Sequence, residues 1–275
     1  MKLKDPILNE NQRTNSLRTI HFLDPSPENS QTVMLLHGLG STSVSWQMQM
    51  NELMQKKFRP IAPDIPGFGK SKRFDGRWTV SSAAQNLVEM MNELGEESFA
   101  VVGFSMGGAV ALQIVLDFPE KINKLVLVNT FAALRPRDLD EAWYFVRRFV
   151  KASLLGAEAQ AELVAHRVFP HPEKEDYRNV VVKQILEADR NTYNQAMRSL
   201  GRFNVLSRLK EISIPTLVIT GERDTTISAH TQEKLVCSIA GAQQVFIPDA
   251  GHAAMIDQPE LFNRALISFL DRNDL

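Results

Sequence analysis

The chain lacks any marked excess of charge and any long apolar run. Its 275 residues carry 31 basic and 32 acidic side chains, for a formal net charge of −1, so nothing favours nucleic acid or an anionic membrane surface as a partner. No apolar run approaches the roughly 20 residues that cross a bilayer. The first residues are polar and have no apolar core of the kind found in a signal peptide. We therefore expect a cytoplasmic protein that binds neither nucleic acid nor membrane.

Cysteine is almost absent as well. The single Cys237 excludes an internal disulfide, and its place in the predicted helix around 231–239 predicts a small buried core residue. No histidine and cysteine cluster has metal-ligand spacing. No Gly-x-Gly-x-x-Gly follows the first strand, which argues against a dinucleotide. We expect neither a metal nor a cofactor.

What the sequence does contain is an alternation of apolar strands and amphipathic helices. Most of the strands are continuously apolar, which fits a parallel sheet covered on both faces. Alternating order with right-handed crossovers predicts an α/β fold with a doubly wound, mostly parallel sheet. The first two strands flank a turn-rich segment and are predicted to form a hairpin. The predicted strands are Ser16–Leu23, Thr32–Leu36, Pro60–Ala62, Phe99–Gly103, Leu125–Val128, Thr216–Thr220 and Gln244–Ile247, and the helices are Ser45–Lys57, Val80–Leu94, Met106–Leu116, His230–Ala240 and Leu261–Leu270.

The alternation stops in the middle of the chain. Residues 131–207 contain no strand-like run and predict several helices rich in aromatic residues and arginine. We predict an inserted helical cap at 131–207 between two parts of one core, 1–130 and 208–275. Most cap aromatics are expected to pack against the core, but some of those in Trp143–Phe149 can form an apolar acyl or alcohol pocket, with Trp143 as the first candidate. A buried cap arginine would favour a substrate that carries a carboxylate.

The most informative motif is Gly-x-Ser-x-Gly at Gly103–Gly107, directly after an apolar strand and at the start of a helix. A serine on such a turn is held in a strained conformation that exposes its hydroxyl, and the two glycines avoid collisions with neighbouring backbone. The helix N-terminus offers free N–H groups at the same point. Ser105 is thus a candidate nucleophile, with a helix N-cap as the alternative.

A serine nucleophile needs a base and an acid that orients the base. His252 and Asp224 each lie in a turn just after one of the last two strands, where residues of an open α/β sheet converge on one crevice. Two other acids, Glu222 and Asp249, lie close to these turns and compete with Asp224.

Together these motifs resemble those of the α/β-hydrolase fold enzymes, over nearly all of the chain outside the cap. The resemblance implies that Ser105, Asp224 and His252 form a catalytic triad in that order. It also implies that the backbone N–H groups of Leu39 and Met106 form an oxyanion hole, with His37 in a structural role beside it. The matching segments are His37-Gly38-Leu39-Gly40, Asp64-Ile65-Pro66-Gly67-Phe68-Gly69-Lys70-Ser71, the turn at Ser105, Gly221–Asp224 and Gly251-His252.

The resemblance predicts a serine hydrolase that cleaves carboxylic esters or lactones of small to medium size through an acyl-serine intermediate. The segment around Ser105 is similar to that of enol-lactonases, small-acyl esterases and cofactor-free haloperoxidases (perhydrolases). Phe104, a candidate substrate contact, stands where hydrolases of carbon–carbon bonds in meta-cleavage products often carry asparagine. A perhydrolase, a carbon–carbon hydrolase and a receptor-like ligand-binding protein remain alternatives. We expect a monomer or a homodimer.

Overall fold

The computed structural model describes residues 20–73, 75–134, 143 and 156–272. Within them, seven strands form one sheet in the order β1-β3-β2-β4-β5-β6-β7, and every neighbouring pair is parallel except β1 and β3. This is the doubly wound sheet that the sequence predicts. The strands are β1 (Phe22–Leu23), β2 (Gln31–Leu36), β3 (Phe58–Pro63), β4 (Phe99–Phe104), β5 (Ile122–Val128), β6 (Thr216–Gly221) and β7 (Gln243–Ile247).

The predicted hairpin at the start of the sheet is wrong. β1 pairs antiparallel with β3, with Phe22 opposite Pro63, and not with β2. The turn-rich connection explains the difference, because the side chains of Ser26 and Asn29 both donate to the carbonyl of Phe58 at the start of β3, over 3.3 and 2.9 Å. The connection therefore crosses β3 instead of folding back as a tight turn.

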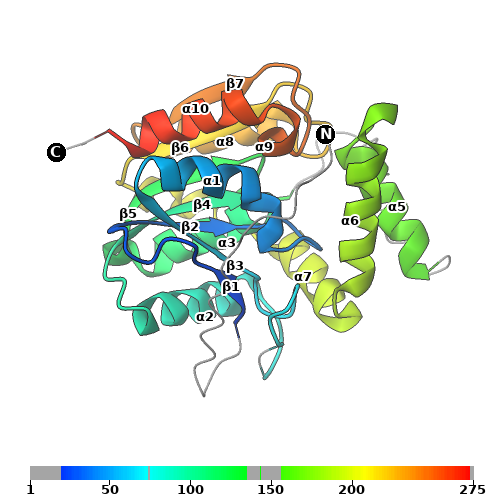
Figure 1. Cartoon of the computed structure of the whole chain (residues 1–275), viewed down its shortest axis with the longest axis horizontal. Helices are drawn as coiled ribbons and strands as arrows, with labels where there is room; N and C mark the ends of the chain where they lie inside the picture. The colour runs from blue at the N-terminus through cyan, green and yellow to red at the C-terminus, as the bar shows by residue number, and fades with distance from the viewer. Residues whose placement is uncertain (1–19, 74, 135–142, 144–155, 273–275) are drawn as a thin grey trace.

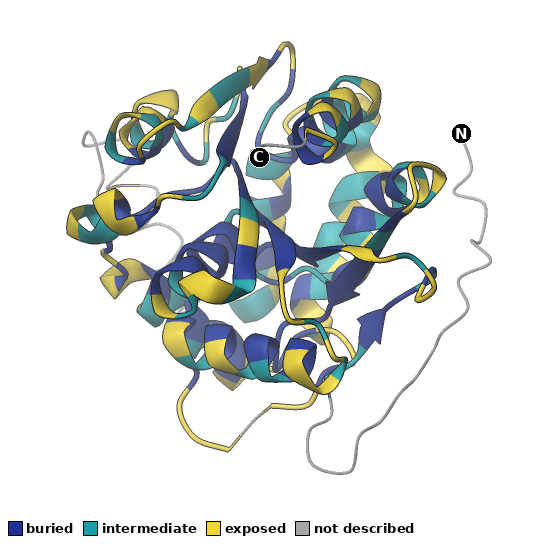
Figure 2. Ribbon diagram, turned by 90° about the vertical axis from the view of Figure 1, so that its left-hand side faces the viewer, coloured by how far each residue is buried: buried dark blue, intermediate teal, exposed yellow. Residues whose placement is uncertain are grey.

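Helices cover both faces of the sheet (Figure 1). Side chains of α1 (Gln47–Gln55) and α10 (Pro259–Leu270) pack on one face, and those of α2 (Val80–Glu93), α3 (Met106–Asp117) and α8 (Ala229–Ser238) pack on the other. Burial in Figure 2 follows this layering, with buried strands between helices that expose only their outer sides. Shorter helices are η1 (Ser43–Trp46), η2 (Pro119–Lys121), η3 (Pro172–Lys174), η4 (Leu206–Glu211) and α9 (Ala254–Asp257).

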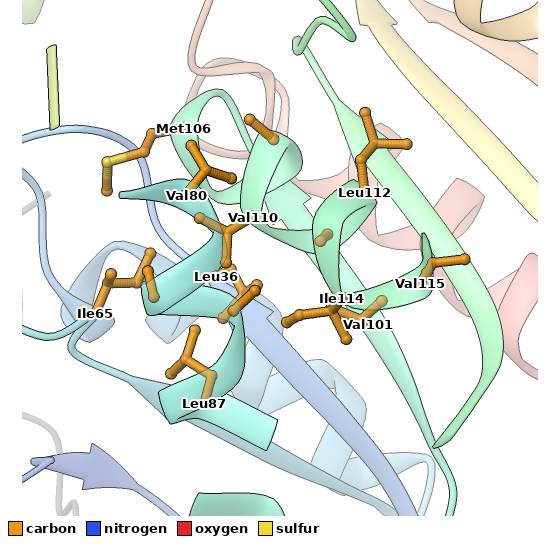
Figure 3. Close-up of a cluster of buried hydrophobic side chains, with 14 of the residues drawn as sticks. Leu36, Ile65, Val80, Leu87, Val101, Met106, Val110, Leu112, Ile114 and Val115 are labelled. Carbon is orange, nitrogen blue, oxygen red and sulfur yellow. The ribbon is translucent and has the colours of Figure 1, made fainter. Parts of the chain in front are cut away.

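Successive residues of the central strands supply the two halves of the core. Leu36 of β2 packs with α2 and α3, whereas its neighbour Leu35 packs with α1 and α10. Figure 3 shows the first half, in which Val101 of β4 lies beside Ile114 of α3 and shares one cluster with Leu87 of α2. Burial of one such aliphatic side chain contributes about 1.5 to 3 kcal/mol, so this packing fixes the strand ends that carry the candidate site.

Cys237 is exposed, so the prediction of a buried core cysteine is wrong. In α8 the buried positions are Gln232 and Leu235, and Ile239 just after the helix is buried too. Residues two apart on a helix point about 200° apart, so burial of Leu235 turns Cys237 outward.

The described residues between β5 and β6 are mainly helical, and they form α5 (Gly156–Val168), α6 (Glu175–Glu187) and α7 (Arg190–Arg202). These helices lie beside the sheet, at the right in Figure 1. The two ends of the insertion meet, because Ala133 and Asn204 form an antiparallel bridge and the N–H of Val205 donates to the carbonyl of Ala132 over 2.9 Å. The residue limits of a cap domain stay a prediction. No helix in the described ranges is both long and apolar enough for a membrane span.

Candidate active site

Ser105 occupies the sharp turn between β4 and α3. Its φ of 52° and ψ of −113° are unusual for a residue with a side chain. A Cβ on Gly103 would lie 2.4 Å from the carbonyl oxygen of Gly107, and a Cβ on Gly107 would lie 2.2 Å from that of Leu36. Only glycine fits at either position. Ser105 precedes α3 but its side chain makes no capping hydrogen bond, so the helix-cap alternative is not supported.

Three side chains from distant parts of the chain meet at this turn in the predicted order. The Oγ atom of Ser105 lies 3.1 Å from Nε2 of His252, and Nδ1 of the same ring lies 2.9 Å from Oδ2 of Asp224. A carboxylate only accepts hydrogen bonds, so Nδ1 carries the proton and Nε2 is left as an acceptor for the serine hydroxyl. The imidazole is therefore oriented to remove a proton from Ser105.

Asp224 is fixed on both of its oxygens. While Oδ2 faces His252, Oδ1 accepts the backbone N–H groups of Thr226 and Ile227 over 2.7 and 3.0 Å. Only 1% of the side chain is exposed. These contacts hold the carboxylate against Nδ1 of His252, where it can stabilise a positively charged imidazole.

The two competing acids lie elsewhere. Glu222 accepts the backbone N–H of Asp249 over 3.3 Å, and Asp249 forms an ion pair with Arg223 in which both side chains are more than half exposed. Of the three acids, only Asp224 hydrogen-bonds His252 among the described residues.

The two residues predicted as oxyanion donors both lie close to Ser105. Leu39 lines the same pocket as Ser105, and Met106 is the first residue of α3, where helix N–H groups have no partner within the helix. His37 holds the preceding turn, because its Nδ1–H donates to the carbonyl of Gly38 over 2.8 Å and its Nε2 accepts the N–H of Ile65 over 2.9 Å. Burial lowers the pKa of His37, and its neutral ring has the structural role that the sequence predicts.

Asp64 ties the end of β3 to the segment that follows Leu39. Its Oδ1 accepts the N–H of Ser43 over 2.7 Å, and its Oδ2 accepts from Nδ1 of His21 over 3.0 Å and the N–H of Lys70 over 2.9 Å. Burial raises the pKa of the Asp64 carboxyl, but the hydrogen bonds from these donors outweigh it and lower the pKa to about 2. A buried carboxylate thus organises the loop on the oxyanion side of the site.

Helix α6 of the inserted segment also contacts the loop that follows Leu39. Ser41 Oγ donates to Oε1 of Gln184 over 3.2 Å, and Nε2 of Gln184 donates to Oγ1 of Thr42 over 3.3 Å. Gly40, with a φ of 73°, lies so close to the insertion that an added Cβ would be 2.7 Å from the side chain of Ile185. The inserted helices therefore form one wall of the site.

A pocket opens beside Ser105 and encloses about 690 Å³ of space, including its opening to solvent. Phe104 lines it, with its ring centroid 4.9 Å from that of His252. Apolar residues of the inserted segment and of the segment after His252 also line it: Val164, Val168, Phe169, Val181, Met255 and Ile256.

Trp143 is not placed in this pocket. Its side chain is 60% exposed, and it is absent from the lining formed by the described residues. Its candidacy rested on the aromatic content of the segment, and composition does not tell which side of a helix faces the substrate. The other aromatic candidates up to Phe149 lie outside the described residues.

Two residues of the site were not found from the sequence. Gln184 lies in the pocket wall, and Asn129 lies buried at the end of β5 with a φ of 44°. A polar residue directly after the apolar run that ends at Val128 was the available signal for Asn129, because strand ends of an α/β sheet border the ligand crevice. Nothing in the sequence distinguished Gln184 from other polar residues of its helix.

The sheet order, the strained serine turn and the hydrogen-bonded serine, histidine and aspartate define a class of protein. The chain belongs to the alpha/beta hydrolase fold family, whose model matches residues 31–259.

Particular relatives within this family are distant. The chain is 28% identical to "Putative carbamate hydrolase RutD" of Variovorax paradoxus, over 92% of this chain and 96% of the relative. It is 27% identical to 3-oxoadipate enol-lactonase 1 of Acinetobacter baylyi, over 92% and 93%. Among solved structures it resembles a thermophilic esterase from Thermogutta terrifontis, with a TM-score of 0.79, 28% identity, and coverage of 91% of this chain and 92% of the esterase. These relatives support the conclusion that the chain is a hydrolase. Their names specify different bonds, namely those of a carbamate, an enol-lactone and an ester.

Proposed function

We propose that the protein is a serine hydrolase that cleaves carboxylic esters or lactones of small to medium size. One observation carries the proposal: the hydroxyl of Ser105, on a strained turn, hydrogen-bonds a histidine that is held in one tautomer by Asp224. This arrangement activates an alcohol as a nucleophile at neutral pH.

In the proposed reaction, Nε2 of His252 takes the proton of Ser105 while Oγ attacks the carbonyl carbon. The negative charge that develops on the carbonyl oxygen is stabilised by the N–H groups of Leu39 and Met106. The tetrahedral intermediate collapses as His252 returns the proton to the leaving alcohol oxygen, which leaves an ester of Ser105. A water molecule, deprotonated by His252, then releases the acid and restores the serine.

The character of the pocket favours uncharged substrates. Among its described lining residues, His252 is the sole titratable side chain, and most of the others are apolar. A substrate carboxylate would lose hydration there without gaining a cationic partner from those residues. We expect butyrate esters to be cleaved with a higher kcat/KM than hemisuccinate esters of the same alcohol.

Hydrolysis of p-nitrophenyl acetate and butyrate tests the proposal. Wild type should release p-nitrophenolate, and Ser105→Ala should lose at least about 10³-fold in kcat. Ser81→Ala, the same chemical change at an exposed position of α2, serves as the matched control. Wild-type activity in Ser105→Ala would refute the assignment.

A carbamate is the second candidate, because the relatives named as carbamate hydrolases match nearly the whole chain. A carbamate has a carbonyl carbon open to the same attack by Ser105. Parallel assays with p-nitrophenyl carbamates, with peroxide and acetate, and with a meta-cleavage product separate ester hydrolysis from carbamate, perhydrolase and carbon–carbon chemistry. A receptor-like binder would instead be phosphonylated once at Ser105 by a fluorophosphonate, with loss of fluoride, and would turn over none of these substrates.

A further inference from the structure

The polar side chain of Asn129 lies fully buried between two of the turns that carry the proposed triad. It directly follows β5, the strand that lies between β4 and β6 in the sheet. The turns after β4 and β6 carry Ser105 and Asp224, and the turn after β7 carries His252. Asn129 is thus at the centre of the edge where the three turns meet.

The amide of Asn129 uses both of its ends. Its Oδ1 accepts the N–H of Gly221, where the turn to Asp224 begins, over 2.8 Å. Its Nδ2 donates to the carbonyl oxygens of Gly251 and His252 over 3.1 and 2.6 Å. One side chain therefore connects the acid turn with the histidine turn, and its shorter donor contact is to His252 itself.

The residues on either side of Asn129 hold the third turn. The carbonyl of Val128 accepts the N–H of Ser105 over 3.0 Å, and the hydroxyl of Thr130 donates to the carbonyl of Ser105 over 2.6 Å. Three consecutive residues thus bond directly to the segments of all three proposed catalytic residues, of which Ser105 and His252 are 147 positions apart in the chain.

The backbone conformation of Asn129 also restricts which residue types fit at this position. Asn129 has a φ of 44°, a region in which asparagine is enriched relative to most residues with a side chain. The acid and histidine turns pass so close together that a Cβ on Gly221 would lie 2.2 Å from the carbonyl oxygen of Gly251. Between backbones at such a separation, a small planar amide with one acceptor and two donors matches the three groups that face it.

We infer that Asn129 is a positioning residue that sets the orientation of His252 toward Ser105 and Asp224. The inference rests on the proposed serine mechanism, in which displacement of a reacting group by about 1 Å costs about 100-fold in rate. Asn129 is absent from the described lining of the pocket, and its hydrogen bonds go to backbone groups and to none of the reacting atoms. It acts through the main chain of His252.

Asn129→Asp tests the donor side selectively. The substitution keeps an oxygen for the N–H of Gly221 but turns a second oxygen toward the carbonyls of Gly251 and His252, where it repels them. We expect kcat for p-nitrophenyl butyrate to fall about 10- to 100-fold while KM changes less than about threefold. Labelling of Ser105 by a fluorophosphonate should slow by a similar factor.

The matched control is Asn123→Asp, the same chemical change at an exposed position near the other end of β5. It should leave kcat and labelling unchanged. Asn129→Gly is the second variant, because glycine adopts a positive φ without strain. It removes both sets of hydrogen bonds and decides the question if Asn129→Asp does not fold.

A role in stability alone predicts a different result. Both Asn129 variants would then lose thermal stability but keep wild-type kcat and labelling per folded molecule, and this outcome would overturn the inference. A further readout is independent of any substrate: the downfield ¹H NMR signal of the His252 Nδ1 proton, assigned by its loss in Asp224→Ala. A shifted or weakened signal in Asn129→Asp supports the inference even if no ester is cleaved, and an unchanged signal refutes it.

Discussion

Replacement of Asp64 by asparagine gives the sharpest quantitative prediction for stability. The Asp64 carboxyl has a pKa of about 2 instead of 3.8, since its hydrogen bonds outweigh the cost of burial. At about 1.4 kcal/mol for each unit of pKa, ionised Asp64 contributes about 2 kcal/mol to the free energy of unfolding at pH 7. Asp64→Asn should remove this contribution. It should also lower the free energy of unfolding by an amount independent of pH, wherever the NH₂ group of the new amide faces an N–H that the carboxylate accepted.

The sign of the pH dependence follows from the lowered pKa. When the pH falls through 3.8, the unfolded chain takes up a proton at Asp64 before the folded protein does, so the stabilisation declines and is lost as the pH passes about 2. At pH 3 about 1 kcal/mol has already been lost. The difference in unfolding free energy between wild type and Asp64→Asn should therefore be about 1 kcal/mol smaller at pH 3 than at pH 7.

Urea unfolding followed by tryptophan fluorescence at both pH values measures this difference. Asp75→Asn, at an exposed position, is the control and should change stability little at either pH. The reasoning fails if the gap between wild type and Asp64→Asn is the same at pH 3 and pH 7, or if it widens in acid.

Three further outcomes follow from packing, capping and burial. Gly107→Ala should prevent folding, because the new Cβ would collide with the carbonyl of Leu36. Gly201→Ala is the control, because it lies in an open part of α7. Thermal unfolding should show that Gly201→Ala stabilises the protein by roughly 0.5 to 1 kcal/mol. Lys124→Met should lower the unfolding free energy by about 1 to 2 kcal/mol in urea, because its ammonium group binds the last carbonyls of α10; an unchanged midpoint would contradict this. Because burial lowers the pKa of His37, the unfolded chain binds a proton there first. The free energy of unfolding should thus decline as the pH falls below about 6.5. If it declines equally steeply in His37→Asn, His37 is not the cause.

The sheet could be predicted because its signals are local. Apolar runs such as Leu125–Val128 identify buried strands, and the glycines around Ser105 identify a tight turn regardless of what packs nearby. The pairing of β1 could not be predicted, because it depends on the carbonyl to which the side chains of Ser26 and Asn29 donate. Such partners lie about 30 residues away in the chain.

The site divides in the same way. Ser105, Asp224 and His252 were predicted as one group because each follows a recognisable strand. Asn129 was missed, since its importance depends on carbonyl and N–H groups of turns that come together only in the folded sheet. Trp143 was selected for its residue type, and the structure exposes it.

The short bridge between Ala133 and Asn204 has a consequence for how members of such a family diversify. Because it joins the two ends of the inserted segment, the chain leaves the sheet and returns to it at nearly the same place. The entropic cost of closing such an excursion grows only slowly with its length, by about 0.6 kcal/mol for each doubling. Segments of other lengths could therefore be transplanted between these two residues, and the pocket wall exchanged, while the chemical machinery at the strand ends is inherited unchanged.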